Sequence, residues 1–294
     1  MVRHLPTALE RPYLPMTADR ISETFAACAK KGRAAFVGYL MAADPSIEIS
    51  FENLKAMVSA GVDIVELGVP FTDPMADGPA IQMAAQRALA AGGSLEVTLE
   101  IARRFRVVNF STPLIVMGYA NPIHRMGFAA FAERAAQAGV DGVITVDLPP
   151  EEDAELRIAL AAHGLAVIRL ATPTTTEKRM VRVADGSSGF VYYVSVAGVT
   201  GAAVGAESDI AAGVERARRI SKLPVAVGFG VRTPDQAARF ARLADGVVVG
   251  SALVEEVRAA VESGDPESCV KRIGVVAESL SNAISSARTE RSVS

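Results

Sequence analysis

Two carboxylates in one short stretch are the side chains of this sequence best placed for acid–base chemistry. Glu66 lies inside an apolar run, Val62–Val69, and Asp77 follows eleven positions later in a segment rich in Gly, Pro and Asp. A carboxylate among apolar residues is costly to ionise without a partner. If the run is a strand and the segment is its loop, both carboxylates face one cleft. Their different settings then push the two pKa values apart and divide acid from base.

Eight short apolar runs, each followed by a helical pattern, must position these side chains. The runs are near-continuous rather than alternating, as expected of parallel strands that are covered on both faces. Eight such units predict a (β/α)8 barrel; a doubly wound sheet is the alternative, but it needs a point where the strand order reverses. The runs are Ala34–Leu40, Val62–Val69, Pro113–Tyr119, Val140–Val146, Leu165–Leu170, Gly189–Val194, Leu223–Val227 and Gly246–Val249.

Helix boundaries support this segmentation. Thr233-Pro234 is typical of an N-cap followed by Pro at the first helical position, and Thr174 to Glu177 has the spacing of a capping box. Three glycines stand where a helix should end and a strand begin, the usual place for a left-handed residue. They are Gly61, Gly139 and Gly164.

Length and composition favour one large domain. Of 294 residues, 50% are hydrophobic, which is ample for a core. Thr17–Lys31 predicts an amphipathic helix ahead of the first strand, and no linker-like composition interrupts the chain before Leu280. We therefore expect a flexible arm over residues 1–16, a single barrel domain over 17–284 with this extra N-terminal helix, and a flexible tail over 285–294.

Charge and hydropathy argue against nucleic-acid and membrane partners. The net charge is −3 and basic residues are dispersed, so no electrostatic footprint for nucleic acid or a membrane surface is present. No window approaches the roughly 20 apolar residues of a membrane span, and we expect no signal peptide in the first residues. With only Cys28 and Cys269 as thiols, both on predicted helices, we expect a cytoplasmic protein.

Other catalytic groups are missing from the predicted strands. The six lysines lie on or near helices, which disfavours a Schiff base, and the three histidines do not cluster with carboxylates, so no metal site is expected. A barrel that breaks a carbon–carbon bond with carboxylates alone needs a substrate that is its own electron sink. An indole ring meets this need, because protonation of its C3 places positive charge on the ring, mainly at nitrogen.

Glycines at two neighbouring strand ends predict a phosphate site. Gly228-Phe229-Gly230 follows the seventh run, and Gly250-Ser251 follows the eighth. In barrels the loops after strands 7 and 8 often bind phosphate together with a short extra helix, whose N-terminus favours the anion. We expect such a short phosphate-binding helix after strand 8. The alternative is that these glycines only form tight turns.

Five stretches, in order along the chain, resemble the tryptophan synthase alpha chain family. The likeness extends from about Ala34 to Leu280 and implies a (β/α)8 barrel that cleaves indole-3-glycerol phosphate to indole and glyceraldehyde 3-phosphate. The stretches are residues 65–79, Tyr119–Pro122, Val146–Pro149, Ala197–Gly201 and Gly228–Gly230. The chain departs from the family in its longer N-terminal arm, in Tyr39 for a more usual Phe, and in Val196 where some members have Arg.

The resemblance implies a role for each matching site residue. Glu66 matches the catalytic acid/base, Asp77 matches the carboxylate that holds the indole N–H, and Tyr192 matches a tyrosine beside the reacting carbons. By period-two alternation Tyr193 points to the opposite face. The implied indole wall is Tyr39, Ile81, Met117 and Ile144, the implied phosphate cradle is Gly201, Gly230, Gly250 and Ser251, and Thr200 lies on a loop that closes over the site.

The resemblance also implies a partner. The family works as an α2β2 complex, in which the beta chain uses pyridoxal phosphate to join indole to serine, while the alpha chain needs no cofactor. The residues implied to face the beta chain are Asp73, Pro74, Asn121 and Pro149. Two other functions remain open at this stage: another phosphate-binding barrel enzyme that acts on sugar phosphates, or a non-catalytic subunit that activates a partner.

Overall fold

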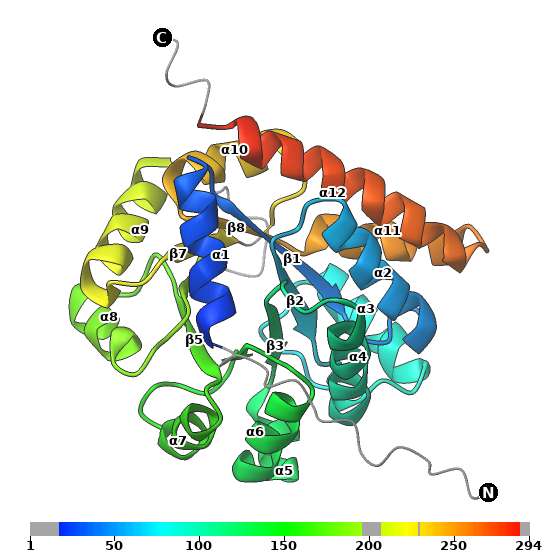
Figure 1. Ribbon diagram of the computed structural model, residues 1–294, viewed down its shortest axis with the longest axis horizontal. Coiled ribbons are helices and arrows are strands. Elements are labelled where there is room, and N and C mark those ends of the chain that lie inside the picture. The colour runs from blue at the N-terminus through cyan, green and yellow to red at the C-terminus, as the bar shows by residue number, and fades with distance from the viewer. Residues whose placement is uncertain (1–17, 196–206, 229, 289–294) are drawn as a thin grey trace, which may run out of the picture.

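Eight parallel strands close into a barrel in sequence order, each paired with the next and β8 with β1 (Figure 1). The computed structural model describes residues 18–195, 207–228 and 230–288, so the predicted arm, Thr200, Gly201 and most of the predicted tail lie outside the described residues. All eight predicted strands are confirmed. They are β1 Ala35–Met41, β2 Ile64–Gly68, β3 Leu114–Gly118, β4 Gly142–Thr145, β5 Ala166–Ala171, β6 Val191–Val194, β7 Val225–Gly228 and β8 Gly246–Val249.

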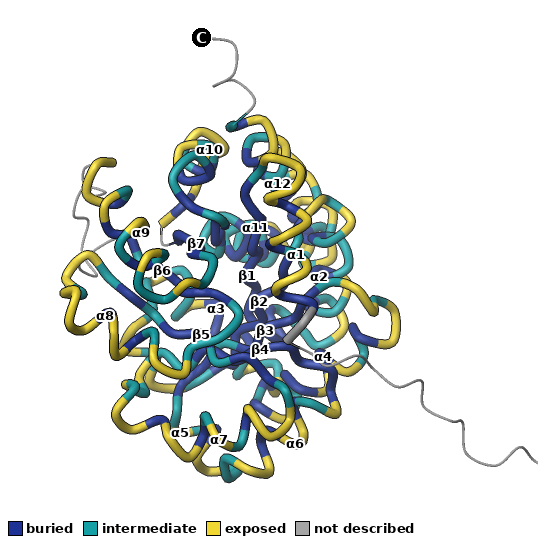
Figure 2. The backbone as a smooth tube through the Cα atoms, turned by 60° about the vertical axis from the view of Figure 1, so that its left-hand side comes forward, coloured by how far each residue is buried: buried dark blue, intermediate teal, exposed yellow. Residues whose placement is uncertain are grey.

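Helices surround the barrel, and their outer faces carry most of the exposed residues while the strands are buried (Figure 2). The extra helix predicted ahead of the first strand is α1, Ala18–Lys30. The others are α2 Ile47–Ser59, α3 Pro79–Ala90, α4 Leu95–Val108, α5 Ala120–Met126, α6 Phe128–Gln137, α7 Ala154–Ala162, α8 Glu177–Ala184, α9 Glu207–Ser221, α10 Pro234–Leu243, α11 Ser251–Glu262 and α12 Cys269–Ser286, with a 3-10 turn, Pro266–Ser268, before α12. None of the described helices is long and apolar enough to cross a membrane.

Side chains alternate between the inside of the barrel and the helix layer. Val37, Ile64 and Ile168 belong to the inner cluster, which α1 covers with its own apolar side chains. Tyr192 lies in this inner cluster, whereas Tyr193 packs in the layer between strands and helices. The alternation predicted for this pair is therefore confirmed, and Tyr192 is the one that faces the interior.

Most predicted helix boundaries are confirmed, and one is wrong. The Thr233 hydroxyl caps α10 by accepting a hydrogen bond from the Gln236 N–H, and the glycines predicted to end helices all have positive φ. The capping box expected from Thr174 to Glu177 does not form. Glu177 is the first helical residue rather than the third, so Thr176 is the N-cap of α8. The Thr174 hydroxyl instead hydrogen-bonds the Thr172 hydroxyl.

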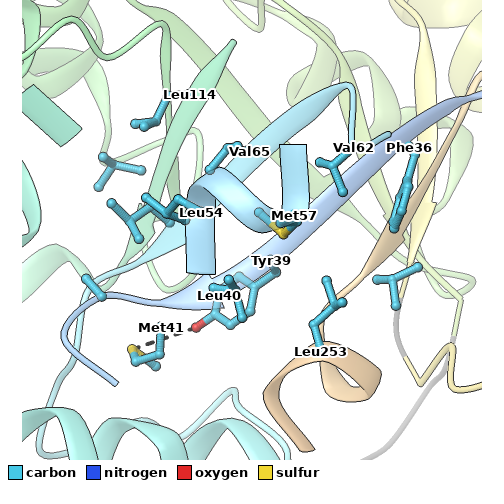
Figure 3. Close-up of a cluster of buried hydrophobic side chains, with 14 of the residues drawn as sticks. Phe36, Tyr39, Leu40, Met41, Leu54, Met57, Val62, Val65, Leu114 and Leu253 are labelled. Atoms are coloured by element: carbon cyan, nitrogen blue, oxygen red, sulfur yellow. Dashed lines mark hydrogen bonds between the residues drawn. The ribbon is translucent and has the colours of Figure 1, made fainter. Parts of the chain in front are cut away.

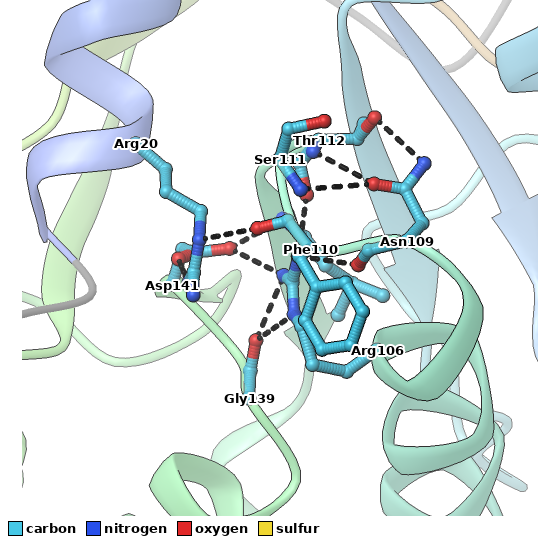
Figure 4. Close-up of polar contacts among 9 residues, drawn as sticks. Arg20, Arg106, Asn109, Phe110, Ser111, Thr112, Gly139 and Asp141 are labelled. Atoms are coloured by element: carbon cyan, nitrogen blue, oxygen red, sulfur yellow. Dashed lines mark hydrogen bonds and ion pairs between the residues drawn. The ribbon is translucent and has the colours of Figure 1, made fainter. Parts of the chain in front are cut away.

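A buried charge network holds α1 against the N-terminal end of the barrel (Figure 4). Asp141, at the start of β4, is fully buried and pairs with Arg20 of α1 at 2.5 Å and with Arg106 of α4 at 2.8 Å. Arg106 also donates to the Gly139 carbonyl, and Arg20 to the Phe110 carbonyl. One carboxylate thus joins a strand to two helices that are far apart in the sequence.

We expect Asp141→Asn to lower the free energy of unfolding by about 3–5 kcal/mol, because it leaves two buried guanidinium groups without their charge partner. Urea denaturation measures this change. Glu100→Gln, which breaks the exposed pair between Glu100 and Arg103, is the control and should change stability by less than about 0.5 kcal/mol. Equal effects of the two substitutions would contradict the importance of the buried network.

Candidate active site

Glu66 is a buried carboxyl on β2, on the same side of the strand as Ile64 of the inner cluster. It lies on β2 between Tyr39 of β1 and Ile115 of β3, and only 1% of it is exposed. Its Oε2 atom has no hydrogen-bond partner among the described residues. Burial, and secondarily the charge of Asp77, raise the pKa of Glu66 to about 8. At neutral pH this side chain is therefore largely protonated.

Asp77 lies on the loop after β2 and is held from the side of β3. The Ala76 N–H donates to the Tyr119 hydroxyl at 3.0 Å. The Tyr119 ring stacks on Phe71 at the start of the same loop, with centroids 5.1 Å apart. Burial raises the pKa of Asp77 to about 6, while hydrogen bonding with Tyr119 acts in the opposite direction. Asp77 is therefore largely ionised at pH 7, when Glu66 is largely protonated.

Tyr119 is a site residue to which sequence reasoning assigned no role. It stands at the end of the third apolar run and opens one of the five stretches that carry the family resemblance. Those signals mark its position, but only the fold shows that its hydroxyl reaches across to the β2–α3 loop. The same hydroxyl is a hydrogen-bond partner of both the loop backbone and Asp77.

Two buried tyrosines, Tyr39 and Tyr192, lie close enough to Glu66 for its charge to add to burial in raising their pKa values. Figure 3 shows Tyr39 with its hydroxyl directed towards Met41. Tyr39 is 7% exposed, and its hydroxyl donates to the Met41 sulfur at 3.9 Å. A Cβ at Gly68 would lie 2.1 Å from the Tyr39 hydroxyl oxygen, so only glycine fits there. Tyr192 is equally buried, and the charges of Glu66 and Asp77 both add to burial in raising its pKa.

The remaining residues of the predicted indole wall lie on three neighbouring elements. Met117 on β3 and Ile144 on β4 are cross-strand partners, on the side of the sheet that faces the interior. Ile81 is half-buried in the first turn of α3, four residues after Asp77. The fold therefore brings the wall residues to the carboxyl ends of adjacent strands, where the two carboxylates also lie.

The described residues of the predicted phosphate cradle lie at the ends of β7 and β8, which pair with each other. Gly230 has φ +72°, a conformation that favours glycine. Gly250 is the N-cap residue of α11 and Ser251 its first residue, so the N-cap itself has no side chain to cap this helix. Among the described residues no side chain accepts from the first N–H groups of α11, which suits a helix N-terminus that binds an anion. The predicted helix after strand 8 is therefore α11, with twelve residues.

The four residues expected to face a partner surround the same end of the barrel. Asp73 and Pro74 share the loop of Asp77, Asn121 lies in the first turn of α5, and Pro149 lies between β4 and α7. Asp73, Asn121 and Pro149 are exposed and Pro74 is half-buried. In the described part of the chain, no three His, Cys, Asp or Glu side chains come together as potential metal ligands.

A closed parallel barrel with a protonated acid and an ionised carboxylate at the carboxyl ends of its strands defines the class of (β/α)8-barrel enzymes that use acid–base chemistry. The family model of the tryptophan synthase alpha chain matches residues 25–285. The alpha chain of Caulobacter sp. (strain K31) is 52% identical over 275 residues, which cover 94% of this chain and 99% of the relative.

Solved structures agree with this match. The tryptophan synthase alpha subunit of Legionella pneumophila str. Paris superimposes with a TM-score of 0.83 at 39% identity, over 90% of this chain and 98% of that one. A chain of Mycobacterium tuberculosis tryptophan synthase gives 0.81 at 37% identity, with the same coverage. The chain belongs to the tryptophan synthase alpha chain family. It is a lyase of tryptophan synthesis, whose reaction is the cleavage of indole-3-glycerol phosphate to indole and glyceraldehyde 3-phosphate.

We expect Glu66→Gln to make the folded state more stable at neutral pH. Between its ordinary value of 4.5 and about 8, the Glu66 carboxyl keeps a proton in the folded state that it releases on unfolding, so stability falls as pH rises through this window. The neutral amide removes this dependence. At pH 7 the gain is on the order of 3 kcal/mol, and it disappears below about pH 4.5.

Urea denaturation across this pH range measures the difference between the variant and the wild type. Glu52→Gln is the matched control, since the Glu52 side chain is 47% exposed and pairs with Lys55 on the surface. A wild-type chain that is as stable as the Glu66 variant at every pH would show that Glu66 is not buried without a partner.

Proposed function

We propose that Glu66 is the acid and base of the cleavage and that Asp77 stabilises the charged indole ring. The protonated Glu66 carboxyl donates to C3 of the indole, and the Asp77 carboxylate accepts a hydrogen bond from the ring N–H. The Glu66 carboxylate then takes the proton of the side-chain hydroxyl as the carbon–carbon bond breaks. The bonding electrons return to the ring, the aldehyde leaves, and Glu66 is protonated again.

The observation that carries this proposal is that Oε2 of Glu66, in an apolar site, has no hydrogen-bond partner among the described residues. A buried carboxyl of this kind with a pKa of about 8 can give and take a proton at neutral pH. Tyr39, Ile81, Met117, Ile144 and Tyr192 would hold the indole ring around it. Gly230, Gly250 and Ser251, together with Gly201, would hold the phosphate, and Thr200 would lie on the closing loop.

We expect Glu66→Gln to lower kcat by about 10²- to 10⁴-fold, the usual contribution of a general acid–base group. Asp77→Ala should also lower kcat strongly, because the developing positive charge on the ring loses its anion. The measurement is glyceraldehyde 3-phosphate release from indole-3-glycerol phosphate. Glu133→Gln, on the exposed face of α6, is the control and should keep the wild-type rate.

Release of product by Glu66→Gln at the wild-type rate would refute this mechanism. Turnover of small sugar phosphates by the wild-type chain, without any indole group, would instead support a different phosphate-binding barrel enzyme. A wild-type chain that cleaves neither substrate but stimulates a partner enzyme would support the non-catalytic activating subunit.

The assembly is a second part of the proposal. We infer a cytoplasmic α2β2 complex in which this chain needs no cofactor and passes indole to a beta subunit that carries pyridoxal phosphate. Asp73, Pro74, Asn121 and Pro149 would face that subunit. Their position at the end of the barrel where Glu66 and Asp77 lie supports this arrangement, because a product released there would emerge beside the partner.

We expect the isolated chain to cleave its substrate slowly and to gain about tenfold or more when a tryptophan synthase beta chain is added. A minor active conformation of the Asp77 loop, populated at about 10% or less, would give this gain once the partner selects it. The same product assay measures the rate with and without the beta chain, and the beta chain alone is the control. Equal rates in both conditions would contradict the proposed activation.

A further inference from the structure

A bidentate ion pair joins the end of β1 to the last turn of α3. The Arg87 Nε donates to Asp44 Oδ1 at 2.8 Å, and Arg87 Nη2 donates to Asp44 Oδ2 at 2.7 Å. Asp44 follows β1 and is 3% exposed, whereas 18% of the Arg87 side chain is exposed. A two-pronged pair of this kind fixes orientation as well as distance, because the planar guanidinium matches both carboxylate oxygens.

Burying the Asp44 carboxylate costs free energy, because the charged group is removed from water. Burial raises the pKa of Asp44, and the hydrogen bonds and charge of Arg87 only partly oppose that effect. A buried ion pair often stabilises a fold no better than apolar residues of the same volume, and its best-attested use is to fix one arrangement among several.

The position of helix α3 needs to be fixed in this way, because the residues that it buries are small. The side chains that it buries are Ala84, Ala85 and Ala88, against β1 and α11. Methyl groups interlock weakly, so this contact alone gives little resistance to a shift of the helix along its axis. The pair between Asp44 and Arg87 opposes that shift directly.

The position of α3 is passed on to the loop of Asp77. Asp77 lies two residues before the helix, and the Gln82 side-chain amide donates to the Asp77 carbonyl at 2.8 Å. The N-cap, Gly78, has no side chain to fix this turn. Arg87 lies about 12 Å along the helix from its first residue, and its side chain hydrogen-bonds Asp44.

We propose that the Asp44–Arg87 pair is a positioning device that sets α3 along β1 and, through Gln82, places Asp77 in the active site. The inference rests on the role given to Asp77 under the proposed function. Loss of the pair would then lower the rate of catalysis separately from its effect on folding.

The test compares four variants of the full chain, assayed well below their unfolding temperatures. Arg87→Gln should lower kcat about 10- to 100-fold, since a shift of about 1 Å at a reacting group can cost that much. Arg87→Lys keeps a positive charge beside Asp44 but cannot form the two parallel hydrogen bonds of the guanidinium. This variant should therefore fold normally and recover part of the rate. Gln82→Leu leaves the ion pair intact and should reproduce the loss of kcat.

The control is Arg104→Gln, which breaks the ion pair between Arg104 of α4 and Glu48 of α2. It should keep the wild-type kcat.

A purely structural role would not move the pH profile, so this profile is the second readout. In the wild type, kcat/KM should rise with pH as Asp77 ionises, with a midpoint of about 6. In Arg87→Gln and Gln82→Leu the displaced loop hydrates Asp77, and the midpoint should move towards the ordinary value of 3.8. The double variant should lose no more rate than the worse single one, because both substitutions interrupt the same path.

Two outcomes would overturn the inference. The first is that Arg87→Gln and Gln82→Leu keep the wild-type kcat and the wild-type midpoint of the pH dependence of kcat/KM. The second is that Arg87→Gln lowers the unfolding temperature without any kinetic change. Asp77→Ala separates this failure from failure of the proposed function. If Asp77→Ala is inactive and the Arg87 and Gln82 variants are not impaired, only the positioning role is wrong; full activity of Asp77→Ala would remove the role of Asp77 itself.

Discussion

The burial of one carboxyl without a charge partner is the constraint on which the rest of this structure depends. Glu66 lies inside a closed barrel, where the surrounding strands exclude water and its Oε2 has no partner among the described residues. The proton it retains at neutral pH follows from that desolvation. The apolar wall, Gly68, which leaves room for the Tyr39 ring, and the parallel closure of the sheet all keep this carboxyl buried.

Two buried carboxyl groups of the barrel, Asp141 and Glu66, differ in the side chains that surround them. Asp141 is fully buried and is paired with two arginines, so its charge joins helices to a strand at the N-terminal end. Glu66 is as deeply buried but faces aromatic rings, so it is poised to exchange a proton. The same kind of side chain thus joins neighbouring elements in one place and keeps its proton at neutral pH in the other.

The second carboxylate, Asp77, is less deeply buried than Glu66 and is held by neighbouring side chains. Asp77 stands on a loop that Tyr119 contacts from β3 and Gln82 contacts from α3. Its pKa, about 6, lies below that of Glu66, so at pH 7 one group is mainly an acid and the other mainly an anion. The division of labour thus depends on a difference in burial of two similar side chains within one pocket.

The sequence alone determined the eight strands, because continuous apolar runs bounded by glycines leave few other ways to cover both faces of a sheet. It also indicated Glu66 and Asp77 as candidate catalytic carboxylates, because their apolar and glycine-rich settings are local features of the chain. It could not assign the cap of α8, where three neighbouring threonines compete, or a role for Tyr119 and Arg87. Their partners lie 43 residues away in the chain. Only closure of the barrel brings such groups together, and it alone sets the burial that separates the two pKa values.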